Sequence, residues 1–246
     1  MVTADRPQLM KRAIHCFNSQ TYPHKELIVV DDGKMDLSPA LKKQVSGEFQ
    51  YIKLDSTKNF TLGELRNISL DKAEGDFLVQ WDDDDWYHPQ RLDLQAAKLE
   101  EGYDACCLPS ALMHLDTYEY MKHPYIGALP DGIPGSIMHV YHSSIRYPSE
   151  RRGEDTVYLK QWKKGKYSRL PEDYYYLFIR CFHGANTWEK EHFLRRTRNT
   201  PIKWLQYAWY RYLKADLYQH PVFQLHAEGR KAFEMYLADS KQVGLL

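Results

Sequence analysis

The 246-residue sequence has no long apolar run, no excess of either charge and only four cysteines. No apolar stretch approaches the ~20 residues that a membrane-spanning helix requires, and the N-terminus lacks the layout of a secretory signal. Lys plus Arg and Asp plus Glu balance at 33 each, so no net field draws the chain to nucleic acid. The cysteines follow no metal or disulfide spacing: Cys16, Cys106, Cys107 and Cys181. These absences predict a reduced, cytoplasmic protein without a nucleic-acid partner.

Strand and helix patterns alternate along the first 108 residues. The predicted strands cover 26–30, 51–54, 77–81 and 103–108, and the predicted helices cover 9–17, 38–46, 62–73 and 89–101. This alternation is typical of an α/β domain with a mainly parallel sheet flanked by helices. A chain of this length can bury one substantial core with an appendage.

The second half of the chain has a different pattern. Residues 111–147 predict antiparallel or edge strands, most clearly at 136–147, around a mobile Pro/Gly-rich loop at 130–135. A helix is predicted at 155–164 and a further strand at 174–181. From residue 187 the spacing of apolar residues is helical to the end.

Four consecutive aspartates, Asp82 to Asp85, follow the apolar strand pattern at 77–81. Adjacent carboxylates repel one another, so a positive charge is expected among them. A hard divalent cation such as Mg²⁺ or Mn²⁺ suits an all-oxygen site of this kind. The alternative is a solvated acidic loop, but the flanking Trp81 and Trp86 make that reading weaker.

Three shorter motifs stand in a fixed order around the aspartates: Thr3-Ala4-Asp5, Asp31-Asp32-Gly33 and Gly153-Glu154-Asp155. In this order the motifs resemble those of family 2 glycosyltransferases of the GT-A fold, over roughly residues 1–185. The resemblance implies a GT-A domain at 1–186, with a nucleotide-sugar half at 1–108 and an acceptor half at 109–186. Residues 187–246 would form a C-terminal helical extension.

The resemblance also implies an activity, namely metal-dependent, inverting transfer of one sugar from a nucleoside diphosphate donor to a hydroxyl group. A UDP-sugar is the favoured donor, and a glycan or a lipid-linked glycan is the expected acceptor. The chain has no QxxRW motif, which favours transfer of a single sugar over polymerisation.

Four residues match donor-binding positions of the family. Thr3 and Asp5 would contact the base, and Asp32 would accept hydrogen bonds from the uracil or ribose. Arg66 would contact the base or the phosphates. In the alternative reading, Asp32 is a turn residue before a glycine and Arg66 is a surface residue paired with a nearby carboxylate.

The aspartate run and one late histidine match the family's metal site, which would hold Mn²⁺ or Mg²⁺. Asp84 would contact the metal directly, while Asp82 or Asp83 would reach the ribose or a metal-bound water. Asp82 is therefore both a donor-binding and a metal candidate. His183 would complete the site, or it is simply a histidine at the end of a strand.

Asp155 is the candidate general base that removes the proton of the acceptor hydroxyl, with Glu154 as its neighbour and backup. Both residues would also suit the start of a helix, where carboxylates are stabilising, and the two roles can coexist. Trp188 would stack on a sugar ring or fill the core.

Residues 201–218 combine Trp and Tyr with Lys and Arg on a helical pattern. Docking on the catalytic domain or on a second subunit of a homo-oligomer is the favoured reading, since an appended helix needs a buried face. Peripheral contact with the inner face of a membrane is the alternative.

The match departs from the family at the N-terminus, where most of a first apolar strand is missing before Met1. We therefore expect that the sequence is a fragment, that its reading frame is mis-started, or that its sheet is built without this strand. Two other functions are alternatives: a non-catalytic nucleotide- or glycan-binding module, and a nucleotidyltransferase, which is less favoured because its glycine-rich phosphate loop is missing from residues 3–12.

Overall fold

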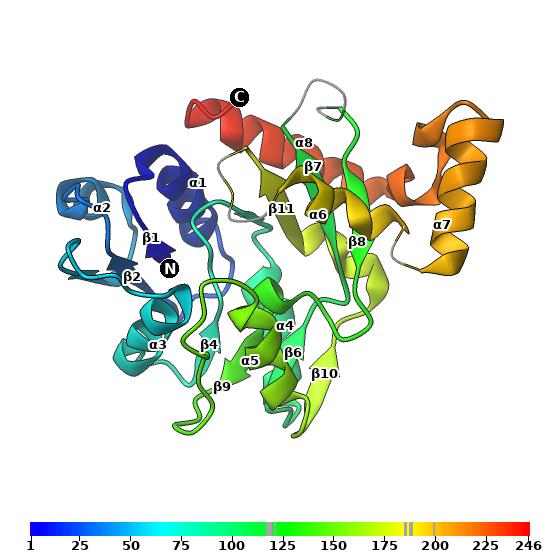
Figure 1. Ribbon diagram of the computed structural model, residues 1–246. Coiled ribbons are helices and arrows are strands. Elements are labelled where there is room, and N and C mark those ends of the chain that lie inside the picture. The colour runs from blue at the N-terminus through cyan, green and yellow to red at the C-terminus, as the bar shows by residue number, and fades with distance from the viewer. Residues whose placement is uncertain (117–119, 121, 185, 187–188, 199) are drawn as a thin grey trace.

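The computed structural model describes residues 1–116, 120, 122–184, 186, 189–198 and 200–246, and it has three short sheets with helices around them (Figure 1). The first sheet contains β1 (Val2–Thr3), β2 (Glu26–Asp31) and β3 (Glu48–Lys53). The second has the order β10 (Tyr167–Arg169), β6 (Ala105–Cys107), β9 (Met138–Val140) and β4 (Phe77–Val79). The third has the order β5 (Trp86–Tyr87), β11 (Phe178–Phe182), β7 (Ser110–Leu115) and β8 (Tyr125–Ala128).

Eight α-helices belong to the described residues. They are α1 (Pro7–Asn18), α2 (Ser38–Gln44), α3 (Leu62–Lys72), α4 (Arg91–Glu100), α5 (Glu154–Trp162), α6 (Lys190–Leu194), α7 (Pro201–Ala208) and α8 (Ala227–Gln242). The predicted α/β class with flanking helices is confirmed. None of the helices in the described part of the chain is both long and apolar enough to cross a bilayer.

Strand pairing brings the sequence motifs together at one edge. β1, β2 and β3 pair in parallel, with Thr3 opposite Asp31 in register. A single bridge between Val2 and Asp82 joins this sheet to the segment that follows β4. Because the carboxyl ends of parallel strands lie at the same edge, residues after β1, β2 and β4 meet there.

The aspartate run is held between buried aromatic rings. Trp81 and Tyr87 lie on either side of the run, with ring centroids 3.9 Å apart, and Tyr87 stacks on Phe178 at 5.3 Å. The fully buried Arg91 lies against these rings, 4.7 Å from the Tyr87 centroid. This packing rejects the reading of a solvated acidic loop, since both ends of the run are fixed in the core.

Several predicted boundaries are wrong. Residues 136–147 form a strand only at β9, because only Met138–Val140 find partners on β4 and β6. Residues 174–181 begin as a 3₁₀ helix, Glu172–Leu177, and become a strand only at β11. The helix expected from Pro89 begins at Arg91. Residues 132–136 of the Pro/Gly-rich loop are buried and include a 3₁₀ turn, Pro134–Ser136.

Other parts of the second half agree with expectation. β8 and β9 both pair antiparallel with their neighbours, and α5 covers the helix predicted near 155–164. All four cysteines are free and buried, as their spacing suggested. Trp188 lies outside the described residues.

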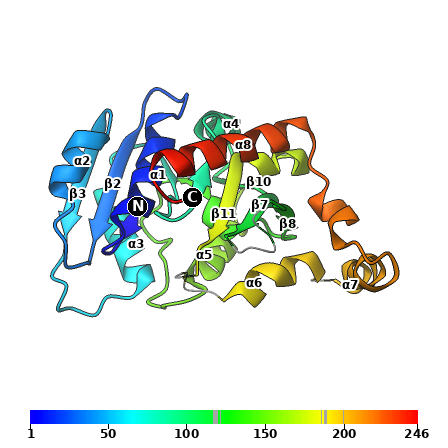
Figure 2. The same ribbon diagram turned by 90° about the horizontal axis from the view of Figure 1, so that it is seen from above.

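The last two helices of the chain, α7 and α8, have different surroundings. α8 lies across α1 and the third sheet (Figure 2), with Phe233 and Tyr236 buried and Ser240 bonded to Arg12 on α1. By contrast, α7 projects at the end of the molecule farthest from β1–β3 and has no buried residue (Figure 1, Figure 2). The apolar residues of this helix therefore do not dock on the catalytic domain as expected, whereas docking on a second subunit stays a prediction.

Candidate active site

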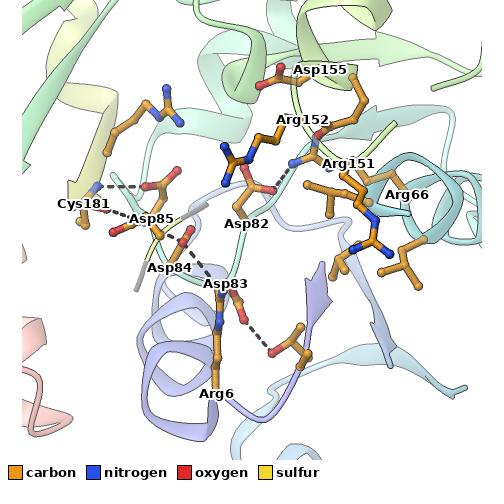
Figure 3. Close-up of a pocket in the computed structure, with 18 of the residues that line it drawn as sticks. Arg6, Arg66, Asp82, Asp83, Asp84, Asp85, Arg151, Arg152, Asp155 and Cys181 are labelled. Carbon is orange, nitrogen blue, oxygen red and sulfur yellow. Dashed lines mark hydrogen bonds and ion pairs between the residues drawn. The ribbon is translucent and has the colours of Figure 1, made fainter. Parts of the chain in front are cut away.

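A pocket of about 230 Å³ lies where β1, β2 and β4 end and α5 begins (Figure 3). It is lined by most of the residues that the sequence singled out. These are Thr3, Asp32, Arg66, Asp82, Asp83, Asp84, Glu154 and Asp155. Segments that are far apart in the chain, up to residue 155, thus converge on one cavity.

Arg66 of α3 connects two of the motifs. Its guanidinium lies 2.9 Å from Oδ1 of Asp82 and also pairs with Oε1 of Glu154. Arg66 and Glu154 are both buried, while Asp82 is partly open to the pocket. The reading of Arg66 as a surface residue is wrong, because its carboxylate partners come from the aspartate run and from α5.

Asp83 points toward β1 and Asp84 points toward β11. The hydroxyl of Thr3 donates to Oδ2 of Asp83 at 2.7 Å, and Arg6 lies 3.5 Å from Oδ1 of Asp83 and 3.6 Å from Asp84. Burial, together with the neighbouring charge of Asp84, raises the pKa of Asp83 to about 7. The run is thus split between two directions, which reduces repulsion among its members.

His183 reaches Asp84 from the end of β11. Its Nε2 lies 3.4 Å from Oδ2 of Asp84, and the amide of Asn186 lies 3.3 Å from the same oxygen. Burial opposes ionisation of Asp84, but the contacts with His183 and Arg6 outweigh it and hold the pKa of this carboxyl below its usual value. Asp84 therefore carries a negative charge that faces the pocket.

No three His, Cys, Asp or Glu side chains within the described ranges are placed so as to enclose a metal ion. Asp82 and Asp84 nevertheless offer oxygen donors at the pocket wall, and His183, which is outside the described lining, contacts Asp84 from behind it. Mg²⁺ is commonly held by one or two carboxylates together with substrate phosphates. These donors fit a metal whose remaining ligands come from a bound diphosphate.

Asp85 has a structural role that separates it from the other three aspartates. It is buried and accepts a hydrogen bond from the backbone N–H of Cys181 on β11, at 3.0 Å. Burial raises its pKa well above the usual value. Asp85 therefore fixes the aspartate run to the third sheet.

Glu154 and Asp155, the first two residues of α5, differ in their partners. Burial raises the pKa of Glu154 and the charge of Arg66 opposes the rise, so this carboxylate is committed to an ion pair. Asp155 is half-buried and points into the pocket (Figure 3), where its Oδ1 accepts from the backbone N–H of Thr156. Of the two, Asp155 is the more available to a bound molecule.

Two aspartates near β2 lie at different depths. Asp32 lines the pocket, and burial raises its pKa. Asp5 is exposed, has a left-handed φ of 52° and accepts hydrogen bonds from the backbone N–H groups of Lys34 and Met35, each at 2.8 Å. Those bonds lower the pKa of Asp5. Its carboxylate holds the loop after β2 and is outside the described pocket lining.

Sequence reasoning missed most of the cations in this pocket. Five arginines line it among the described residues: Arg6, Arg66, Arg151, Arg152 and Arg180. Only the nearness of Arg6 to Thr3, and of Arg151 and Arg152 to the Glu154 motif, could have signalled them. Seven described carboxylates line the same cavity, so arginines and carboxylates alternate on its wall.

Comparison with known proteins identifies relatives across nearly the whole chain. The family described as glycosyl transferase family 2 matches residues 1–212. The structure is similar to Staphylococcus aureus TarS 1–349 in complex with UDP, with a TM-score of 0.56 and 15% identity over 99% of this chain and 79% of that one. It is also similar to the mannosyltransferase PcManGT from Pyrobaculum calidifontis in complex with GDP-Man and Mn²⁺, with a TM-score of 0.55 and 14% identity over 100% of this chain and 74% of that one.

Curated relatives match shorter stretches. The chain is 30% identical over 103 residues to the GalNAc(5)-diNAcBac-PP-undecaprenol beta-1,3-glucosyltransferase of Campylobacter jejuni, which covers 41% of this chain and 33% of the relative. Three further curated relatives are covered over 19%, 23% and 60% of their lengths. The chain therefore spans less than two thirds of these proteins.

Proposed function

The chain belongs to glycosyl transferase family 2, and from that premise we propose that it transfers a single sugar from a nucleoside diphosphate donor to a hydroxyl acceptor, with inversion at the anomeric carbon. One observation carries the proposal. Asp82, Asp83 and Asp84, at the end of the second sheet, line the same pocket as Asp155, at the start of α5. A donor site and a proton acceptor therefore share one cavity.

Thr3, Asp32 and Arg66 support a donor site at the carboxyl ends of β1 and β2, where open α/β sheets bind nucleotides. In this proposal Asp32 accepts hydrogen bonds from the base or ribose, and Arg66 faces the phosphates while remaining paired with Asp82. Asp5 supports the loop behind Asp32, because its carboxylate already holds two backbone N–H groups. UDP is the first choice of nucleotide, since TarS was crystallised with it, and GDP is the alternative.

A divalent metal, Mn²⁺ or Mg²⁺, would neutralise the charge that grows on the leaving diphosphate. Asp84 and His183 would hold it, with Asp82 contacting the metal or one of its waters. The ionised state of Asp84 supports this assignment. The arginines around the cavity, Arg6 and Arg180 among them, would supply further positive charge to the phosphate oxygens.

Asp155 is the proposed general base. Its carboxylate faces the cavity, whereas Glu154 is engaged with Arg66 and would position α5 against the donor site. Deprotonating the acceptor hydroxyl as it attacks the anomeric carbon contributes ~10²–10⁴-fold in reactions of this type.

We place the acceptor among glycans and lipid-linked glycans and the reaction in the cytoplasm at the inner face of a membrane. The name of the Campylobacter jejuni relative, which includes an undecaprenol-linked glycan, supports this choice. A homo-oligomer remains the alternative explanation for the exposed helix α7.

Thermal unfolding with UDP and GDP, each with and without Mn²⁺, tests the donor site first. A ligand at one hundred times its dissociation constant adds about 2.7 kcal/mol to stability, and each kcal/mol raises the midpoint of a domain of this size by about 2–4 °C. We expect a rise of several degrees that needs Mn²⁺. No rise with any nucleoside diphosphate would contradict the proposal.

Turnover of nucleotide-sugar donors with glycan and membrane-lipid acceptors then separates an enzyme from a binding module. Asp155→Asn should reduce turnover by ~10²–10⁴-fold while the shift caused by the donor stays unchanged. Asp173→Asn, at an exposed position of the 3₁₀ helix before β11, is the matched control. Full turnover by Asp155→Asn would reject the general-base assignment, and nucleotide binding without any turnover would favour a non-catalytic module.

A further inference from the structure

The helix α7 and the π-helical turn that follows it, Trp209–Leu213, expose an apolar stripe. Four of its residues are more than half exposed: Ile202 at 71%, Leu205 at 63%, Trp209 at 51% and Tyr212 at 76%. Ile202 and Leu205 are three residues apart on α7 and Trp209 follows four residues later, so these three share one side of the helix, and Tyr212 extends the exposed apolar surface along the π-helical turn. An apolar face on a soluble helix normally turns toward the protein core, and here it turns away from it.

The other face of the same helix attaches it to the chain. Lys203, Tyr207 and Tyr210 also recur at intervals of four and three, and all three are half-buried. The guanidinium of Arg198 lies 5.4 Å from the Tyr207 ring, and the Tyr210 ring lies 5.3 Å from that of His220. These contacts fix the orientation of the helix, so the outward direction of the apolar stripe is built into the fold.

The stripe belongs to a basic stretch of the sequence that lies between Glu191 and Asp216. Residues 192–215 contain six cations and no carboxylate: Arg195, Arg196, Arg198, Lys203, Arg211 and Lys214. The rest of the chain has 27 Lys and Arg against 33 Asp and Glu. The total charge is balanced only because residues 192–215 are basic and the remaining residues are net acidic. Arg211 and Lys214 are exposed beside Tyr212.

We propose that the outer face of α7 and its π-helical turn binds the surface of an anionic lipid bilayer. Trp and Tyr suit the interface between lipid headgroups and acyl chains, and Lys and Arg next to them bind acidic headgroups. A second copy of this chain fits less well, because a twofold contact through the stripe would bring two basic segments together. The charge of the segment thus selects a lipid surface over self-association.

The connection to the pocket is short. α6 contributes Phe193 to the pocket lining and continues through the 3₁₀ turn Arg195–Arg198 to α7. A helix seated on a membrane would therefore hold the chain at that surface through the segment that follows the pocket residue Phe193. Under the proposed function, a lipid-linked acceptor would then approach along the bilayer, although lipid binding itself does not depend on sugar transfer.

Flotation of the full chain with vesicles tests the proposal, using phosphatidylcholine alone and phosphatidylcholine mixed with phosphatidylglycerol. We expect binding to the mixed vesicles only. Leu205→Ser combined with Trp209→Ser should lower the partition coefficient by about a hundredfold. Arg211→Glu combined with Lys214→Glu should lower it by at least about tenfold.

Matched controls are available elsewhere on the surface. Tyr141→Ser removes an aromatic residue that is 50% exposed outside the segment, and Lys42→Glu combined with Lys43→Glu makes the same charge change on α2. Both should bind as the unaltered chain does. A circular dichroism melt of each variant establishes that it is folded.

Three results would overturn the proposal. The first is that the chain does not bind anionic vesicles, and the second is that the Leu205→Ser, Trp209→Ser variant binds them as well as the unaltered chain does. The third is that the unaltered chain self-associates in sedimentation and this double variant does not. Nucleotide-dependent thermal shifts are measured on the same samples without lipid. A chain that binds UDP but not vesicles rejects the lipid surface alone, while one that binds vesicles but no nucleotide rejects the donor site alone.

Discussion

The pocket and the outer face of α7 are both rich in cations, but the surroundings of these charges differ. In the pocket Arg66 lies between Asp82 and Glu154, and Arg6 faces Asp83 and Asp84. After α7, Arg211 and Lys214 are exposed next to the exposed Tyr212 and Leu213, and residues 192–215 contain no carboxylate.

This contrast separates two kinds of binding region. Where charges are matched within the chain, they fix side chains in place and prepare a site for a ligand of defined geometry. Where positive charges accompany an outward apolar stripe, the complement is an extended anionic surface. The first region should therefore be sensitive to single substitutions, and the second should respond to total charge and to salt.

The largest expected effect is in the pocket. Asp84→Asn keeps the shape of the side chain but removes the charge proposed to hold the metal. We expect turnover to fall by about a thousandfold, equivalent to ~4 kcal/mol in activation free energy. Glu48→Gln, an exposed carboxyl on β3, should have no effect. If Asp84→Asn and the unaltered chain turned over the donor at the same rate, Asp84 would not be needed to hold the metal. The pocket would then lack the sensitivity to single substitutions that is expected to distinguish it from the α7 region.

A pair of arginine substitutions compares the regions in stability. Arg66→Met leaves Glu154 buried without its partner, which should lower the free energy of unfolding by about 3–5 kcal/mol. Arg211→Met on the exposed turn after α7 should change it by less than about 0.5 kcal/mol. Chemical denaturation measures both, and similar losses in the two variants would show that the cations are not held differently.

The stability of the fold should depend on pH through a buried histidine that lies outside both regions, whereas vesicle binding by α7 should not. His139 of β9 is buried against Tyr158 and Trp162, and burial lowers its pKa to about 4 from the usual 6.5. Because the folded pKa is the lower one, this stability is complete above pH 6.5 and is lost as the pH falls through about 4. The loss should be about 3 kcal/mol.

His139→Phe should therefore flatten the acid limb of the stability curve, whereas His24→Gln, at an exposed position, should leave it unchanged. The α7 region is proposed to bind lipid through arginine, lysine and apolar side chains, none of which is a residue type that changes charge near neutral pH. Vesicle binding by the folded chain should consequently be constant between pH 5 and 8. A steep loss of vesicle binding within that interval would contradict the assignment.

Added salt should have the smallest effect of these changes on the free energy of unfolding, but it should weaken binding to anionic vesicles measurably. Raising ionic strength from 0.1 to 1 M shortens the screening length from about 10 to about 3 Å. Exposed cations near α7 should then bind anionic vesicles about tenfold less tightly. The free energy of unfolding should change by less than about 1 kcal/mol, because the ion pairs of Arg66 are buried.

Local patterns were sufficient to predict much of the first half of the chain. The apolar run before Asp31, the helical spacing at 62–73 and the run that ends in the aspartates all became elements close to their expected bounds. Thr61 and Glu64 form a capping box at the start of α3, which is a signal readable from four residues. Each of these features depends on neighbours in sequence.

Features that depend on distant partners were not predictable. The alternation at 136–147 resembles a long strand, but pairing partners exist only for β9. The partner of Arg66 on α5 lies 88 residues away in the chain, and Arg180 and Asn186 reach the pocket from β11 and the segment after it. The outward turn of α7 likewise depends on where Tyr207 and Tyr210 find contacts.

Titration calorimetry of UDP and GDP, with and without Mn²⁺, tests the central claim that the aspartate end of β4 holds a metal-bound nucleoside diphosphate. The account predicts that at least one of the two binds to the unaltered chain only when Mn²⁺ is present, and that Asp84→Asn abolishes this binding. Equal binding by Asp84→Asn and the unaltered chain, or no binding of either nucleotide under any condition, would contradict it.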